Sequence, residues 1–402
     1  MDKLNEEKVF RDPIHGYVRV DESVVWKCIQ TKEFQRLRRI KQLGSTSLVY
    51  HTGEHSRFAH SLGVYEIVRR MINEVRDLRE KLTDYEKVTV MLAGLLHDIG
   101  HAPFSHSFET IMKRKHEEYT VQIISQPSEV KSVLDSYSPH LADDVASVIN
   151  GTHPNGILCQ LVSSQLDADR MDYLLRDSYF TGTKYGEFDL ERILRTMRVS
   201  NDQLVVKVSG MHTIEDYIMA RYHMYWQVYY HPVSRSYDVL LKNIFKRLVD
   251  LYLGDPEKIL KEYPMYRALL TKEVMSNEDI YLLDDPCCLY SFQLMRMGDD
   301  EILADLTRRL LDRDLFKYCN IDKSDEILKR LKEKDFDLDY YFYQDHQTQN
   351  PYSPYNGKTH SIWVLLENKE IGELSSISNI VSSICQNSSY QDEKIFFPKE
   401  VL

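Results

Sequence analysis

His97 and Asp98 are adjacent in the sequence and end an apolar run that begins at Val88. We expect this run to form a buried helix, which leaves two polar side chains at its end. An unpaired buried polar or charged group costs several kcal/mol, and one metal ion would satisfy both side chains. Neutral imidazole and carboxylate are ordinary ligands of Zn, Fe and Mn, so the pair indicates a metal site.

Other candidate ligands surround this pair. His60 lies upstream, Asp167 and Asp169 lie downstream, and three further histidines follow the pair: His101, His106 and His116. Two histidines and two carboxylates would form a mononuclear site with room for a water molecule. A simple hydrogen bond between one histidine and one aspartate is the usual alternative, but the surplus of matching residues favours the metal.

The elements that must hold these groups are mostly helices. Thr83 and Glu86 form a capping-box pattern at the start of the helix that leads to His97. Apolar residues keep helical spacing over 34–40 and 62–72, and an aromatic-rich helix is expected over 221–231. Short strands are expected at 17–20, after a turn, and at 204–208, in a hairpin. We therefore predict a mainly α fold with a helical core.

The pattern changes after about residue 265. We expect helices over 301–311 and 324–334, strands over 340–343 and 362–366, and a loop over 344–360. These signals predict a catalytic core over residues 1–265 and a smaller α+β region over 266–402, packed on the core and at subunit interfaces.

Composition excludes several classes of protein. The chain has 402 residues, 43% of them hydrophobic, and no apolar run long enough to span a membrane. A formal net charge of −11 makes nucleic acid an unfavourable main partner. The six cysteines form no CxxC pair, and the N-terminus has no secretory signal, so we expect a reduced, cytoplasmic protein. Neither a P-loop nor the dinucleotide-binding glycine pattern is present.

Six segments together resemble one family. They are Asp12-Pro13-Ile14-His15-Gly16, Phe34-Gln35-Arg36-Leu37-Arg38, Ile40-Lys41-Gln42-Leu43-Gly44, the segment 57–64 around His60, the segment 97–106, and Asp169-Arg170-Met171-Asp172-Tyr173. This set resembles the HD-domain deoxynucleoside triphosphate (dNTP) triphosphohydrolases of the SAM-and-HD-domain type, over roughly residues 8–320 and without a preceding SAM domain. The resemblance implies cleavage of a dNTP into deoxynucleoside and intact triphosphate.

The resemblance also implies roles for the residues that match the family motifs. The metal, one divalent ion (Mn, Fe, Zn or Mg), would be held by His60, His97, Asp98 and Asp169. A further Mg²⁺ could accompany the nucleotide. His106 would transfer a proton to the leaving 5′-oxygen, His101 would contact phosphate, and Glu109 would orient His106. His116 is the third conserved histidine, for which simple packing or capping is the alternative.

Substrate contacts are implied along one helix and at three other places. Asp169, Asp172, Tyr173, Arg176 and Asp177 share a helical face. The family match places Tyr173, Asp177, Gln42 and Leu43 beside the sugar, Arg57 and Arg170 at the phosphates, Arg221 at the γ-phosphate and Tyr229 near the base. Asp167 and Asp172 could equally be structural partners of arginine, and the aromatic residues around Arg221 could be core.

The resemblance implies regulation as well, because relatives are tetramers with activator nucleotides at subunit interfaces. Lys8, Gln35 and Arg38 match one activator site, with Arg192, Arg313 and Lys317 as its companions. Gln30 stands where some relatives have an acidic residue that reads guanine, and an amide cannot accept both guanine N–H hydrogen bonds. The activator is therefore left open between a dNTP and GTP, and Lys8, Gln35 and Arg38 could also be plain surface residues.

Other functions remain as alternatives. An HD phosphohydrolase for a monophosphate, a cyclic nucleotide or an alarmone is one, although Gln42, Tyr173 and Asp177 argue against it. A di-iron oxygenase would need His101 and His116 as additional ligands. A nucleotide-sensing or nucleic-acid-binding module is a third alternative. Its basic patch would be Arg36, Arg38, Arg39 and Lys41, a run that is more typical of a solvated helix face.

Overall fold

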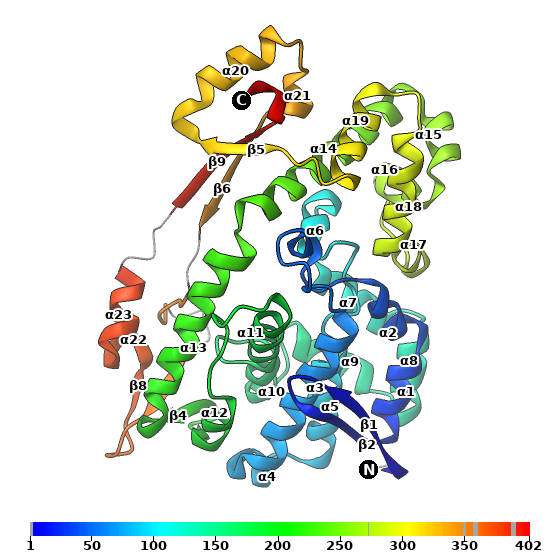
Figure 1. The fold of residues 1–402 in the computed structure, drawn as a ribbon. Helices are drawn as coiled ribbons and strands as arrows, with labels where there is room; N and C mark the ends of the chain where they lie inside the picture. The colour runs from blue at the N-terminus through cyan, green and yellow to red at the C-terminus, as the bar shows by residue number, and fades with distance from the viewer. Residues whose placement is uncertain (1–2, 272, 349–350, 357–360, 387–390) are drawn as a thin grey trace.

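A computed structural model describes residues 3–271, 273–348, 351–356, 361–386 and 391–402, and the structural statements below refer to these residues. Most of the described chain is helical, with three small sheets at its margins (Figure 1). The predicted mainly α fold, with a helical core and a smaller C-terminal α+β region, is confirmed. No helix in the described ranges is both long enough and apolar enough to cross a membrane.

The helices of the first half build the core. They are α1 (Ser23–Gln30), α2 (Lys32–Arg36), α3 (Arg57–Glu74), α4 (Arg76–Lys81), α5 (Asp84–Leu96), α6 (His106–Met112), α7 (His116–Ser125), α8 (Glu129–Tyr137), α9 (Leu141–Ile149), α10 (Gly156–Val162), α11 (Ala168–Thr181) and α12 (Leu190–Thr196). Helix α3 packs against both α5 and α11 in the buried centre of the core. This packing brings the ends of three helices together.

The helices of the second half extend from that core. They are α13 (Met211–Met224), α14 (Pro232–Gly254), α15 (Pro256–Glu262), α16 (Arg267–Thr271), α17 (Asn277–Leu282), α18 (Asp285–Arg296), α19 (Glu301–Leu311), α20 (Ser324–Glu333), α21 (Leu338–Tyr341), α22 (Leu374–Ile377) and α23 (Asn379–Gln386). Helix α14 is 23 residues long and runs from the core toward the C-terminal sheet (Figure 1). It therefore links the two parts of the chain.

The strands form three sheets. They are β1 (Lys3–Asp12), β2 (Gly16–Glu22), β3 (Met197–Ser200), β4 (Gln203–Lys207), β5 (Lys317–Asn320), β6 (Tyr343–Thr348), β7 (Trp363–Leu365), β8 (Ile371–Glu373) and β9 (Gln391–Phe397). The sheet orders are β1-β2, β3-β4-β7-β8 and β5-β9-β6. Because β7 pairs in parallel with β4, the C-terminal region returns to the core hairpin. The predicted boundary near residue 265 stays a prediction.

Local sequence explains the start of each helix that carries a candidate ligand. Ser56 caps α3 by accepting from the Ala59 N–H, and Thr83 with Glu86 forms the predicted capping box of α5. Asp167 caps α11 by accepting from the Arg170 N–H. These caps fix where the three helices begin, and so fix the positions of the residues that follow.

Three sequence predictions are wrong in part. Residues 340–343 are not a strand, because Asp337 caps the short helix α21, and the strand begins only at Tyr343. The predicted loop 344–360 begins instead as strand β6, which pairs with β9; residues 349–350 and 357–360 lie outside the described ranges. The predicted helix 221–231 leaves the α form at Tyr225 and continues as a π-helical turn over Tyr225–Tyr229.

Candidate metal centre and substrate cavity

Four side chains from three helices converge on one point. His60 comes from α3, His97 and Asp98 follow α5, and Asp169 lies in the first turn of α11. The Nε2 atom of His60 lies 3.1 Å from Asp169 Oδ1 and 3.7 Å from Asp98 Oδ2, and His97 Nε2 lies 3.3 Å from Asp98 Oδ1. Ligand atoms about 2.1 Å from a tetrahedral ion stand about 3.4 Å apart, so the spacing suits one divalent metal.

The hydrogen bonds of the two histidines support this reading. His60 Nδ1 lies 2.8 Å from Asp172 Oδ2, and His97 Nδ1 lies 2.9 Å from the Gly94 carbonyl oxygen, so both Nδ1 atoms serve as donors. The Nε2 atoms of both rings are buried and have no hydrogen-bond partner. Two free lone pairs therefore face the carboxylates, which is the arrangement that metal-binding histidines require.

The charges of the cluster favour a positive centre. Burial disfavours protonation of His60, but the adjacent carboxylates of Asp169 and Asp172 outweigh it and raise the pKa of His60 to about 10. Burial also opposes ionisation of Asp169, yet its contacts with His60 and His97 hold its pKa well below the usual range. A cluster with this balance could hold a divalent cation, while the identity of the metal is not fixed by the geometry.

Asp172 organises a second layer behind His60. Besides His60, it contacts His15 Nε2 at 2.6 Å and forms an ion pair with Arg176, whose guanidinium also binds Asp12 at 2.8 Å. Asp172 is fully buried, and the neighbouring arginine and histidines outweigh that burial and lower its pKa. The N-terminal hairpin is thereby tied to α11 through the support of a candidate ligand.

Gly63 shows how closely this second layer is packed. A Cβ atom at this position in α3 would lie 1.9 Å from Asp172 Oδ1 and 2.5 Å from Arg176 Nη2. The side chains Asp172 and Arg176 therefore occupy space that only a glycine on α3 leaves open.

Arg57 connects the metal cluster to the next loop. Its Nη1 donates a short hydrogen bond to Asp98, and its Nε donates to Ser105 Oγ at 2.9 Å. Phe104 and Ser105 both have positive φ angles, 55° and 56°, a costly conformation for residues other than glycine. The Phe104 N–H donates to Asp285 at 2.9 Å, so this strained turn is held in place just before α6.

A second cluster of histidines lies beside the first. Glu109 Oε1 contacts His106 Nδ1 at 3.2 Å and His116 Nδ1 at 2.5 Å, and these contacts outweigh burial and lower the pKa of Glu109. The rings of His101 and His116 are stacked with centroids 3.7 Å apart. The structure thus brings together the four residues proposed as catalytic, and Glu109 contacts two rings rather than only His106.

The two inner members of this cluster differ in burial from His106. His101 is 1% exposed, and burial together with Arg57 lowers its pKa well below the ordinary value. The His106 side chain is 69% exposed and lines the adjacent cavity. Four ligand atoms of this cluster lie close enough together for a second metal. However, a metal binds in the plane of an imidazole ring, and the stacked rings of His101 and His116 cannot both have one ion in their planes.

A cavity of about 500 Å³ opens next to these clusters. Seven residues predicted from the sequence line it: Gln42, Leu43, Arg57, His106, Tyr173, Asp177 and Tyr229. Arg57 joins the cavity to the metal cluster, because it lines the cavity and also pairs with Asp98. The volume lies within the range of small-molecule sites.

One wall of the cavity is held by Asp177. This carboxylate accepts from the Tyr229 hydroxyl at 2.8 Å and contacts His55 Nε2 at 2.8 Å. Tyr229 belongs to the π-helical turn, and its ring lies 6.1 Å from that of Tyr173 in an edge-to-face arrangement. Such turns often occur at functional sites, and here the turn brings a tyrosine onto the cavity wall.

Arg170 and Arg221 lie outside the cavity lining. Arg170 Nη1 donates to Asp167 and to the Ser164 carbonyl oxygen, both at 2.5 Å, while its Nε atom is buried without a partner. The Arg221 guanidinium lies 5.9 Å from the centre of the Tyr225 ring, and its Nε and Nη1 atoms are likewise buried without a partner. Both arginines thus retain unused donors.

The six residues predicted for an activator site belong to the two groups named above, and among the described residues only Gln35 and Arg38 of these six hydrogen-bond to each other. Arg38 donates to Gln35 Oε1 at 2.9 Å and lies over the Phe58 ring, while Lys8 pairs with Glu6 on β1. In the other group, Arg192 donates to the Ser209 carbonyl oxygen, Arg313 donates to that of Leu48, and Lys317 is exposed at the start of β5. No hydrogen bond or ion pair given for the described residues joins the two groups.

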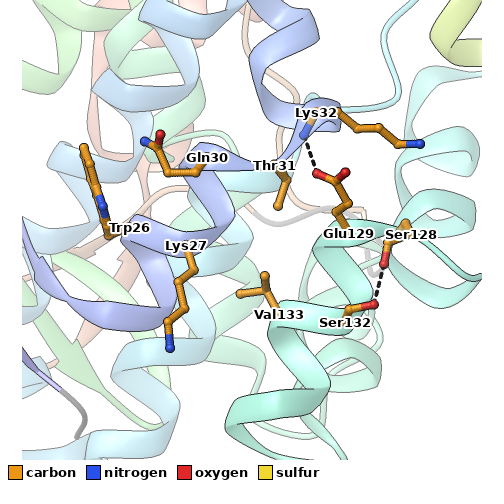
Figure 2. A pocket seen from close by; sticks show the side chains of 9 residues that line it. All are labelled: Trp26, Lys27, Gln30, Thr31, Lys32, Ser128, Glu129, Ser132 and Val133. Carbon is orange, nitrogen blue, oxygen red and sulfur yellow. Dashed lines mark hydrogen bonds between the residues drawn. The ribbon is translucent and has the colours of Figure 1, made fainter.

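Gln30 lines a groove that the other residues predicted for this activator site do not line. It lines an open groove of about 750 Å³ between α1 and α8, together with Trp26 and Lys32 (Figure 2). Glu129 crosses this groove and accepts from the Lys32 N–H at 2.8 Å (Figure 2). Lys8, Gln35 and Arg38 do not line it.

The basic run near residue 36 is exposed at Arg38 and Arg39 but buried at Arg36. Arg36 is 1% exposed and donates to the carbonyl oxygens of Leu283 and His101 at 2.7 and 2.8 Å. Arg39 pairs with Asp284, and Lys41 pairs with Glu54. The basic-patch prediction and the solvated-face prediction are therefore both wrong for Arg36. Its side chain instead connects the loop after His97 to the segment between α17 and α18.

Sequence reasoning gave no role to four residues that contact the site: His15, His55, Ser105 and Asp285. Each acts on a residue far away in the sequence, such as His15 on Asp172 and Asp285 on Phe104. The only available signal was the position of His15 inside the Asp12-Pro13-Ile14-His15-Gly16 motif.

Comparison with known proteins agrees with this geometry. Residues 57–177 match the HD domain, and residues 188–263 match the HD associated region. The chain is 47% identical to the uncharacterized protein YwfO of Bacillus subtilis, over 100% of this chain and 94% of that protein. It is 28% identical to the deoxynucleoside triphosphate triphosphohydrolase SAMHD1 of Gallus gallus, over 80% of this chain and 57% of that protein.

Solved structures give the same result. A phosphohydrolase of Bacteroides thetaiotaomicron superposes with a TM-score of 0.83 and 27% identity, covering 98% of this chain and 100% of that chain. The HD domain match spans all four converging residues, from His60 to Asp169. The chain belongs to the HD-domain family of phosphohydrolases.

Proposed function

We propose that the protein hydrolyses dNTPs to deoxynucleoside and inorganic triphosphate. The observation that carries this proposal is the cavity, in which Gln42, Leu43, Tyr173, Asp177 and Tyr229 stand within one enclosure with Arg57 and His106. A cavity with one closely packed aromatic wall suits a deoxyribose, and Arg57 at the end next to the metal cluster suits a phosphate. The match to relatives named as dNTP triphosphohydrolases supports the same substrate class.

The metal cluster would lie at the α-phosphate. His60, His97, Asp98 and Asp169 would hold one divalent ion, which when bound would polarise a phosphate oxygen and lower the pKa of a water molecule. Arg57, already paired with Asp98, would orient the same phosphate, and the unused donors of Arg170 and Arg221 would receive the β- and γ-phosphates.

Proton transfer to the leaving group falls to His106. A water molecule would attack the α-phosphorus and release one proton to the solvent while the bond from phosphorus to the 5′-oxygen breaks. That oxygen would take a proton from His106, which regains one from the solvent. Glu109 accepts a hydrogen bond from Nδ1 of this ring, which leaves Nε2 available to the cavity. His101, which is buried and neutral beside Arg57, would contact a phosphate oxygen.

The resemblance to the HD-domain dNTP triphosphohydrolases also supports a proposal about regulation. We propose a cytoplasmic homotetramer in which Lys8, Gln35 and Arg38 of one copy bind an activator nucleotide together with Arg192, Arg313 and Lys317 of another. Within one copy, no hydrogen bond or ion pair among the described residues joins the two groups, which fits a site shared between copies. Size-exclusion chromatography with light scattering, with and without nucleotide, tests this part: a monomer under all conditions would contradict it.

Product analysis tests the reaction. Purified protein with Mn²⁺ is incubated with each dNTP, alone and in pairs, and the products are resolved by ion-exchange chromatography. We expect deoxynucleoside and intact triphosphate, with faster turnover in pairs if a second nucleotide activates. Orthophosphate, pyrophosphate, or no turnover in any mixture would contradict the proposal and favour another HD phosphohydrolase activity. The Asp169→Ala variant is the matched control for contaminating enzymes.

A further inference from the structure

The cavity has a polar wall that the proposed reaction does not use. Arg235, Asp238 and Lys242 of α14 line it at spacings of three and four residues, so they share one helical face. Gln347 of β6 lines it beside them. This wall, which we call the α14 wall, consists of these four residues and lies on different elements from the metal ligands.

Two members of the α14 wall already have firm partners. Arg235 Nε donates to Asp345 at 2.8 Å, and its Nη1 donates a short hydrogen bond to Asp392. Gln347 Nε2 donates to the same Asp345 oxygen at 3.0 Å. These contacts fix the two side chains to the C-terminal sheet.

Asp238 and Lys242 have fewer and weaker bonding partners than Arg235 and Gln347. Ser107 donates to Asp238 Oδ1 at 2.7 Å, but no cation of the described chain lies within ion-pair distance of this carboxylate. Burial raises the pKa of Asp238 to about 6, against the opposing influence of Ser107, Ser45 and Lys242. Lys242 Nζ has only a long contact of 3.5 Å to the Tyr343 hydroxyl and lies 5.3 Å from that ring centre. An acceptor and a donor therefore remain free to bind a ligand.

The position of this wall relative to the phosphates indicates which part of a nucleotide it meets. Arg57 marks the end of the cavity that adjoins the metal cluster, and Arg170 and Arg221 lie on the α11 and α13 side. Gln42, Tyr173 and Asp177 form the wall assigned to the sugar. Among the described residues, Arg235, Asp238 and Lys242 of the α14 wall are the charged cavity residues that the proposed reaction and sugar contacts leave unassigned.

We infer that Asp238 and Lys242 contact the base of the substrate and select guanine. The inference rests on the proposed dNTP hydrolysis and adds its base preference. A carboxylate can accept hydrogen bonds from both N1–H and the N2 amino group of guanine, and an ammonium group can donate to O6. Adenine presents an amino group where guanine has O6, so Lys242 would face a donor. Thymine and cytosine offer Asp238 only one N–H group each on this edge.

Kinetics with the four dNTPs test the inference. We expect wild-type protein to have its highest kcat/KM with dGTP. Asp238→Asn should lower kcat/KM for dGTP about 10- to 100-fold and change that for dATP less than about threefold, since a hydrogen bond to a charged group contributes that much. Lys242→Met should lower the dGTP-to-dATP ratio about tenfold and provides a second variant if Asp238→Asn does not fold. Asp299→Asn, an exposed carboxylate outside the cavity, is the matched control.

A binding experiment separates this inference from the proposed reaction. Calorimetric titration with deoxyguanosine and deoxyadenosine reports base contacts without phosphate chemistry. Weaker deoxyguanosine binding in Asp238→Asn, with unchanged deoxyadenosine binding, supports the inference even if no dNTP is hydrolysed. If dNTPs are hydrolysed but dGTP is not preferred, or if both variants leave the dGTP-to-dATP ratio unchanged, the assignment of the base to this wall is wrong.

Discussion

The carboxylates of the metal cluster and of the α14 wall differ in their bonding partners. At the cluster, the ligand Asp98 pairs with Arg57, and Asp172 behind His60 pairs with Arg176, so both carboxylates meet a cation. At the α14 wall, Asp238 meets hydroxyl groups, and burial raises its pKa to about 6. The carboxylates of the cluster thus have cationic partners, whereas Asp238 has no ion pair among the described residues.

The two regions also differ in what holds their side chains in position. The cluster is held by helix caps and by a second layer of ion pairs, which fix each ligand before any ion arrives. The wall is held by Arg235, which fixes the helix but leaves Asp238 and Lys242 free. In the proposed reaction, the catalytic groups are on the part fixed by ion pairs, and the groups proposed to select the base are on the part without them.

The largest effect should come from breaking the cluster itself. Asp169→Ala removes a carboxylate that contacts both histidines, so we expect loss of bound metal and at least a thousandfold loss of activity. Metal analysis by mass spectrometry and the dNTP assay measure both effects. Circular dichroism should show a folded protein, and Asp216→Ala on the exposed side of α13 is the control. Retained metal in Asp169→Ala would contradict the proposed ligand set.

A smaller effect should follow from removing His106. Loss of a positioned proton donor typically costs 10²- to 10⁴-fold in rate, so His106→Ala should lower kcat by about that factor. Because this exposed ring is not among the ligands, bound metal should remain at the wild-type level. A loss of metal together with activity would place His106 inside the cluster and remove the distinction between the two groups.

The second layer should have an intermediate effect on metal affinity. Asp172→Asn keeps the size of the side chain but weakens the support of His60, so we expect about 10- to 100-fold weaker metal binding. Competition with a chelating dye measures this affinity. Asp167→Asn is a useful comparison, because Asp167 pairs with Arg170 and caps α11 but contacts no ligand directly. Equal weakening in both variants would indicate a general loss of packing.

The smallest effect concerns stability at the α14 wall. Because the folded-state pKa of Asp238 is about 6 and the unfolded value is near 3.8, the folded state binds more protons between these values. This residue therefore lowers stability as pH rises from about 4 to 6. Asp238→Asn should raise the free energy of unfolding by about 1 to 2 kcal/mol at pH 8 and by almost nothing below pH 4. Urea titrations at both pH values measure this; an equal gain at pH 3.5 would contradict it.

Much of the cluster could be predicted from the sequence because its ligands sit at helix ends. The capping box at Thr83 and the apolar run before His97 identify helix α5 and its end, and the structure confirms both. The same local signals failed at residues 340–343, where aromatic residues suggested a strand. There Asp337 starts a turn of helix, and the hydroxyls of Tyr340 and Tyr341 reach Asp250 and Asp305.

The sequence could not predict contacts between residues that lie far apart along the chain. His15 and Asp172 are 157 residues apart, and nothing local indicates their contact. Arg36 reads as a surface residue by composition, yet it is buried because three backbone carbonyl oxygens accept its hydrogen bonds. The α14 wall was missed for the same reason, since Asp238 meets Ser107 only after α14 packs on α6.

The ion pairs of Arg235 set an order for events during synthesis. All four metal ligands and their second layer lie within the first 177 residues, so a growing chain holds them early. Arg235 gains its partners only when Asp345 and Asp392 have emerged from the ribosome. The α14 wall is therefore completed only after every residue of the metal cluster has been synthesised.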